Sequence, residues 1–217
     1  MHERTAREGA QYPAAQNLSP RVHSWTGSRS SSRRCGATAI RRSPRKRSCS
    51  IEPIRRCLDR LGVYAFEEPV STDNLEASAH LAQQLDLKIA GYESEQLAYN
   101  FRRLIDQGCV DIVQPDVTWA GGISECRRIA ALAQAAHREI APHCFSSAVC
   151  LMASLHFLCS VPNPGLLEMD QNPNGLRTEI ARDPVSVDAD GFVTVPEKPG
   201  LGVELIDDVV EKYRVEG

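Results

Sequence analysis

Short apolar runs that each end at an acid or a histidine recur along the chain about every 25 residues. The residues that end these runs are Glu67, Glu93, Asp116, His143 and Glu168, and neighbours in this series are 23 to 27 residues apart. One strand followed by one helix occupies a segment of this length. The spacing therefore predicts an α/β fold, a partial (β/α) barrel of the TIM type with about five strand–helix units.

The stretch from residue 110 to residue 147 shows this unit most clearly. Residues 110–113 are mostly β-branched and apolar, which predicts a buried parallel strand that ends at the following proline. Residues 123–137 carry apolar positions at helical spacing and predict a helix. Asp116 and His143 would then both follow strand ends, at the carboxyl edge of the sheet, where α/β folds place their chemistry.

The rest of the chain predicts further helices and a different C-terminal segment. Apolar spacing predicts helices over residues 52–61, 75–85, 95–107 and 146–160. After residue 170 the sequence predicts a small hairpin, residues 185–188 with 192–195, and a closing helix over 204–213. We expect this segment to form a lid or flap that packs outside the barrel.

Residues 1–50 differ from the remainder and are predicted to be disordered or non-native, so that residues 51–217 form the folded domain. They contain 11 Lys and Arg but two acids, in a chain whose totals are 25 and 28. A transit-type presequence, a nucleic-acid-binding arm and a non-native start are the three interpretations. We favour the last, because neither the apolar spacing of a presequence nor interleaved aromatic residues are present. We therefore expect no nucleic-acid partner.

The cysteines and the hydropathy pattern bear on the cellular compartment of the protein. The chain has eight cysteines, and no two of them form a C-x-x-C pair. This pattern favours neither a zinc site nor a disulfide framework, and indicates a reducing cytoplasm. No run of 18 apolar residues occurs, so no membrane span and no membrane partner are predicted.

Carboxylates at the ends of adjacent strands point into one basin and predict a metal site. Glu67 and Glu93 are the candidate ligands, and their oxygens suit Mg²⁺ or Mn²⁺. Asp116 can orient the ring of His143 and raise its basicity, so that His143 serves as an acid–base group. Glu168 would lie one strand further, within reach of a substrate oxygen. A divalent cation beside a base suits removal of a proton α to a carboxylate.

Five short motifs, in this order along the chain, resemble those of a known family. They are FEEPV (66–70), IAGYESE (89–95), DIVQPDVTWAGG (111–122), APH (141–143) and LLEMD (166–170). Together they resemble the mandelate racemase/muconate lactonizing enzyme group of the enolase superfamily. The segments QPDVTW and PGLGVEL resemble the acid-sugar dehydratases of that group more than its cycloisomerases.

This resemblance implies a lyase that eliminates water from a sugar acid, a small-molecule substrate. It implies Mg²⁺ bound by Glu67 and Glu93, an Asp116–His143 pair as general acid and base, and Glu168 as hydrogen-bond partner of the substrate carboxylate. We also expect a homo-oligomer if the chain folds. A racemase or epimerase of the same superfamily is the alternative reaction, because the same pair can return a proton to carbon.

The sequence also departs from the family pattern. The family's third metal ligand, an aspartate, should fall near residue 41, but residues 9–51 contain neither Asp nor Glu. No counterpart of the family's lysine base is visible, since Lys88 is predicted at the amino end of its strand. The amino-terminal capping domain has no counterpart either. We therefore expect weak metal binding, marginal stability and little or no activity, and a non-catalytic remnant is the competing interpretation.

Overall fold

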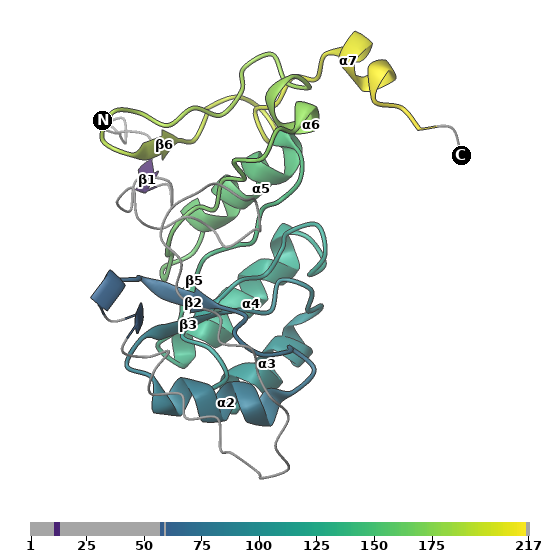
Figure 1. Cartoon of the computed structure of the whole chain (residues 1–217). Helices are drawn as coiled ribbons and strands as arrows, with labels where there is room; N and C mark the ends of the chain where they lie inside the picture. The colour runs from purple at the N-terminus through teal and green to yellow at the C-terminus, as the bar shows by residue number, and fades with distance from the viewer. Residues whose placement is uncertain (1–10, 14–56, 59, 216–217) are drawn as a thin grey trace, which may run out of the picture.

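A parallel sheet of four strands forms the centre of the computed structural model, which describes residues 11–13, 57–58 and 60–215 (Figure 1). The strands stand in the order of the sequence: β2 (Ala65–Glu67), β3 (Lys88–Gly91), β4 (Ile112–Val113) and β5 (Glu139–Ile140). A parallel bridge from Ile140 to Pro164 continues the sheet beyond β5. Parallel neighbours in sequential order, joined by helices, are the arrangement of a (β/α) barrel segment, which confirms the predicted fold class.

Three helices connect the strands and pack against the sheet (Figure 1): α2 (Leu75–Gln84), α3 (Ala98–Asp106) and α4 (Ile123–Ala135). In α4 the side chains at helical spacing are fully buried, among them Ile129 and Ala133. On the sheet, Val113 and Ile140 are paired in register and have no exposed surface. The apolar spacing of the sequence thus becomes the shared core of helices and strands.

Contacts between neighbouring units determine where α3 begins. The predicted helix starts at residue 95, whereas α3 starts at Ala98, because Leu97 has a positive φ of 62°. Leu97 offers no side-chain cap, and the backbone N–H of Ala98 instead donates to Glu125 Oε1 of α4 at 2.8 Å. A carboxylate from the following helix therefore caps the preceding one.

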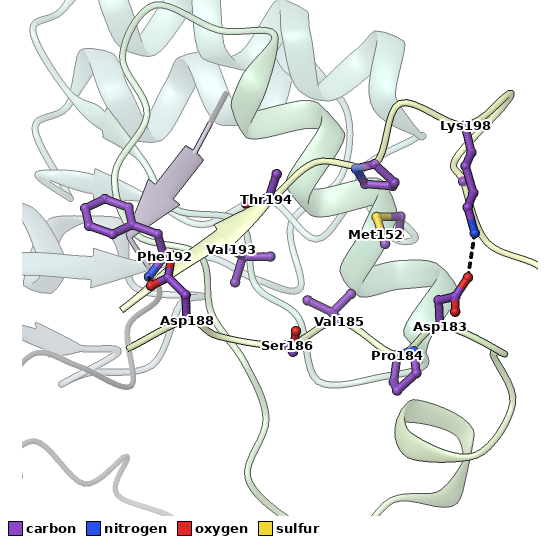
Figure 2. Close-up of a pocket in the computed structure, with 12 residues that line it drawn as sticks. Met152, Asp183, Pro184, Val185, Ser186, Asp188, Phe192, Val193, Thr194 and Lys198 are labelled. Carbon is purple, nitrogen blue, oxygen red and sulfur yellow. Dashed lines mark hydrogen bonds and ion pairs between the residues drawn. The ribbon is translucent and has the colours of Figure 1, made fainter. Parts of the chain in front are cut away.

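The C-terminal segment packs along α5 (Ala148–Cys159) rather than on the sheet. It contains α6 (Gly175–Thr178), β6 (Phe192–Thr194) and α7 (Asp207–Lys212), which Figure 1 shows beside and beyond α5. The ring of His156 on α5 lies with Nε2 3.1 Å from the carbonyl oxygen of Leu201. Residues 183–202 of this segment line a hollow of about 400 Å³, to which α5 contributes Met152 (Figure 2).

The predicted hairpin over 185–188 and 192–195 is wrong in its pairing. Asp188 Oδ1 accepts hydrogen bonds from the backbone N–H groups of Asp190 and Phe192, at 3.0 and 2.8 Å. A backbone hydrogen bond from the N–H of Asp188 to the carbonyl of Phe192, at 2.9 Å, also closes this turn, but residues 185–187 form no strand. The strand that pairs with β6 is β1 (Gln11–Pro13), in antiparallel register.

Strand β1 is the part of residues 1–50 that the structure describes, and the prediction that this segment is disordered or non-native stays a prediction. The rest of that segment lies outside the described residues, as does most of the helix predicted over 52–61. In the part of the chain that the structure describes, no helix has both the length and the apolar character needed to cross a membrane.

The buried side of α3 provides a test of this packing. Leu104 is 1% exposed in the core, whereas Tyr99 on the same helix is 68% exposed. We expect Leu104→Ala to lower the unfolding free energy by about 2–5 kcal/mol, because it leaves a cavity. Tyr99→Ala should change it by no more than about 0.5 kcal/mol. Urea unfolding followed by circular dichroism measures both, and equal effects would contradict the packing described.

Candidate metal and acid–base site

The five predicted site residues follow the carboxyl ends of successive parallel strands. Glu67 is the last residue of β2, and Glu93 comes two residues after the end of β3. Asp116 follows β4, His143 follows β5, and Glu168 follows the segment that bridges to Ile140. The sheet therefore carries all five to one edge.

Three of these residues lie close enough to share one metal ion. Ligand atoms of Glu67, Glu93 and His143 all lie within 4.8 Å of one another. His143 Nδ1 is 3.0 Å from Glu93 Oε2 and 2.9 Å from Glu168 Oε2. Neither contact has the geometry of a hydrogen bond, so Nδ1 is a buried polar atom without a hydrogen-bond partner among the described residues.

This donor set fits a divalent cation. Two carboxylates supply the hard oxygen ligands that Mg²⁺ and Mn²⁺ prefer. The ring of His143 belongs to the same group, and an imidazole nitrogen suits Mn²⁺ and other first-row ions better than Mg²⁺. The position near residue 41, where the resemblance places a third carboxylate, lies outside the described residues.

The close approach of like charges perturbs the titration of the site. Burial raises the pKa of Glu67, and the charge of Glu168 raises it further. Burial also raises the pKa of Glu93, which the neighbouring His143 partly offsets. Burial lowers the pKa of His143, but the contact with Glu168 and the charges of Glu93 and Asp116 outweigh it and raise the pKa to about 9. Without a cation, a protonated His143 balances this cluster of carboxylates.

Asp116 is held apart from this cluster by its own loop. Its carboxylate is buried, and Oδ1 accepts hydrogen bonds from the backbone N–H and the hydroxyl of Thr118, both at 2.6 Å. The nitrogen Nδ1 of His143 lies against Glu93 and Glu168 instead. Asp116 thus acts on His143 through its charge, and the role of the Asp116–His143 pair stays a prediction.

Glu68 fixes the turn that carries Glu93. Its backbone has φ 38°, and its N–H donates to the carbonyl of Ala90 at 3.0 Å. Its side-chain Oε1 accepts from the backbone N–H of Tyr92 at 3.0 Å. A Cβ on Gly91, where φ is 151°, would stand 2.8 Å from Glu68 Cγ. Only a glycine leaves room for this side chain, which explains the residue at that position.

Two further contacts that the sequence analysis did not identify support the carboxylates. Gln114 Nε2 donates to Glu67 Oε1 at 3.0 Å, and the backbone N–H of Cys144 donates to Glu168 Oε2 at 2.8 Å. The sequence did carry a signal for Gln114, because it is a polar residue that directly follows a buried strand and lies two positions before Asp116. The Cys144 contact comes from the backbone and has no sequence signal.

Lys88 lies away from this site, as predicted. It is the first residue of β3, so it stands at the amino end of the sheet. There its amine pairs with Glu139, and the hydroxyl of Tyr64 donates to Glu139 Oε2 at 2.9 Å. The hollow of Figure 2 is also separate, because none of the five strand-end residues lines it.

The chain belongs to the family described as enolase C-terminal domain-like, which matches residues 46–209. It is 38% identical over 165 residues to an arabinonate dehydratase of Saccharolobus solfataricus, covering 76% of this chain and 43% of that protein. It is 33% identical over 162 residues to a D-galactarolactone cycloisomerase of Agrobacterium fabrum, covering 71% of this chain and 43% of that protein.

Solved structures of the same superfamily have the same arrangement. The crystal structure of the 3,6-anhydro-D-galactonate cycloisomerase from Zobellia galactanivorans superposes with a TM-score of 0.69 at 36% identity, covering 74% of this chain and 45% of that one. The chain thus spans less than half the length of the relatives it matches. These matches confirm the predicted superfamily and its mandelate racemase-like group.

The raised pKa of His143 predicts how stability depends on pH. Because the folded-state pKa of about 9 exceeds the ordinary value of 6.5, protonation of His143 stabilises the metal-free fold fully below about pH 6.5. This contribution should be lost as the pH rises towards about 9. Urea unfolding across this range measures it, and His143→Gln should flatten the dependence. An unchanged slope in the variant would rule out His143 as its source.

Proposed function

We propose that this chain carries the carboxyl-terminal part of a metal-dependent sugar-acid dehydratase site. The observation that carries the proposal is the convergence of Glu67, Glu93 and His143 ligand atoms within 4.8 Å. The names of the relatives support the substrate class, since they include an arabinonate dehydratase and a D-galactonate dehydratase of Variovorax paradoxus. The substrate proposed here is accordingly a small sugar acid with hydroxyl groups on the carbons α and β to its carboxylate.

Glu67 and Glu93 would hold a divalent cation, Mg²⁺ or Mn²⁺, at the strand ends. That cation would stabilise the negative charge that develops on the substrate carboxylate when the α-proton leaves. Glu168, anchored by the N–H of Cys144, lies beside His143 and would face the same carboxylate group. His143 would then lie next to the carbon that becomes acidic, as a proton-transfer group.

His143 is proposed to move the proton in both halves of the reaction. In its neutral form it accepts the α-proton, and the C–H electron pair forms the C=C bond of the enol as the β-hydroxyl leaves. The protonated ring gives that proton to the departing hydroxyl, so that water forms. The enol then tautomerises to a 2-keto-3-deoxy acid. The high pKa of His143 in the metal-free site favours the proton-donating form.

Two other reactions use the same groups. Return of the proton to the α-carbon would give a racemase or epimerase. The cycloisomerases among the relatives indicate a third outcome, an intramolecular addition or elimination at the same carbon.

A non-catalytic remnant is the competing hypothesis. Homo-oligomerisation and a cytoplasmic location stay predictions.

Product analysis in deuterated water separates these reactions. The chain would be incubated with a panel of sugar acids and Mg²⁺ or Mn²⁺. Release of a 2-keto-3-deoxy acid supports the dehydratase, whereas deuterium at the α-carbon without loss of water supports racemisation. A chain that binds the cation but transforms no substrate is the result expected of the remnant.

Removal of a metal ligand tests the cation site directly. We expect Glu93→Gln to weaken Mn²⁺ binding by at least ~10-fold, because a neutral amide replaces a charged ligand. Glu211→Gln, on the exposed helix α7 where the residue pairs with Arg214, is the control and should leave the affinity unchanged. Isothermal titration measures both. Equal affinities in the two variants would exclude Glu93 as a ligand.

A further inference from the structure

Gln114 occupies an unusual place beside the proposed cation site. It directly follows β4, its backbone N–H donates to the carbonyl of Gly91 at 3.2 Å, and the residue is 9% exposed. Its side chain reaches across the end of β3 to β2, where Nε2 donates to Glu67 Oε1 at 3.0 Å. Through its backbone N–H and its side-chain amide, this one residue therefore ties together the ends of three neighbouring strands.

The other end of this amide is open. Gln114 Oε1 is buried and has no hydrogen-bond partner among the described residues. A flip of the side-chain amide would exchange Oε1 and Nε2. It would place the carbonyl oxygen against the carboxylate of Glu67, and two acceptors repel. Glu67 therefore sets the orientation of the amide, at the cost of an unsatisfied carbonyl.

Glu67 needs such a restraint. Its carboxylate shares the sheet edge with Glu93 and Glu168, which both repel it, and the residue as a whole is exposed. A free glutamate would turn towards water and away from these charges. The N–H of Gln114 instead holds one carboxylate oxygen on the inner side of the site, next to the ligand atoms of Glu93 and His143.

We propose that Gln114 is a positioning residue of this site: its side-chain N–H orients the Glu67 carboxylate towards the cation. This inference rests on the proposed function, because the cation is the one proposed there. Gln114 itself does not bind the cation, and it acts through the ligand that it contacts. Partners that orient metal ligands in this way commonly change metal affinity by about 10- to 100-fold.

The test measures Mn²⁺ affinity by electron paramagnetic resonance in the full chain, together with the thermal unfolding temperature of the metal-free protein. Gln114→Met keeps the length of the side chain and removes its donor, and we expect it to weaken Mn²⁺ binding about 10- to 100-fold. Its unfolding temperature should change little, since one hydrogen bond and one unsatisfied carbonyl are lost together. Gln134→Met, at an exposed position on α4, is the matched control.

A second variant keeps the side-chain amide but moves it away from Glu67. Gln114→Asn is one methylene shorter and cannot reach Glu67, so it should lose affinity to the same extent even if Gln114→Met proves unstable. An affinity within twofold of the unsubstituted chain in either folded variant overturns the inference alone. A lower unfolding temperature with unchanged affinity also overturns it, because that is the mark of a structural role. An unsubstituted chain that binds no Mn²⁺ overturns the proposed function and this inference together.

Discussion

Repulsion among carboxylates at one edge of a parallel sheet is the constraint on which this structure depends. Glu67, Glu93 and Glu168 are brought to that edge because every strand runs in the same direction and ends at the same level. Like charges at this separation destabilise the fold unless an opposite charge lies among them. His143 supplies that charge when it is protonated, and the high pKa of its ring is the consequence. A divalent cation would supply it in the proposed active state.

The core makes this arrangement rigid although the strands are short. β4 and β5 contain two residues each, yet Val113 and Ile140 are fully buried and paired in register. Helix α4 covers them with an apolar face, and its Glu125 also caps α3. A small displacement of one unit is therefore resisted by its neighbours, which keeps the strand-end side chains within reach of one another.

The hydrogen bonds behind the carboxylates show how the site tolerates its charge. Glu67, Glu93 and Glu168 would separate if they were free, but Gln114, the Glu68–Gly91 turn and the N–H of Cys144 hold either the carboxylates or the backbone that carries them. The opposite edge of the sheet has no such conflict. There Lys88 pairs with Glu139, so charges of both signs cancel within the described part of the chain.

The sequence by itself determined the order of strands and helices, the parallel sheet and the edge at which Glu67, Glu93, Asp116, His143 and Glu168 lie. These follow from the apolar periodicity, because short apolar strands that alternate with amphipathic helices have few ways to bury their apolar surfaces together. Tertiary structure alone decided that His143 faces Glu93 and Glu168 while Asp116 bonds to Thr118. It also decided that β6 pairs with β1 and that Glu125 caps α3. Apart from the local Asp116–Thr118 bond, these contacts join residues far apart in the chain, and their geometry depends on packing that no local pattern encodes.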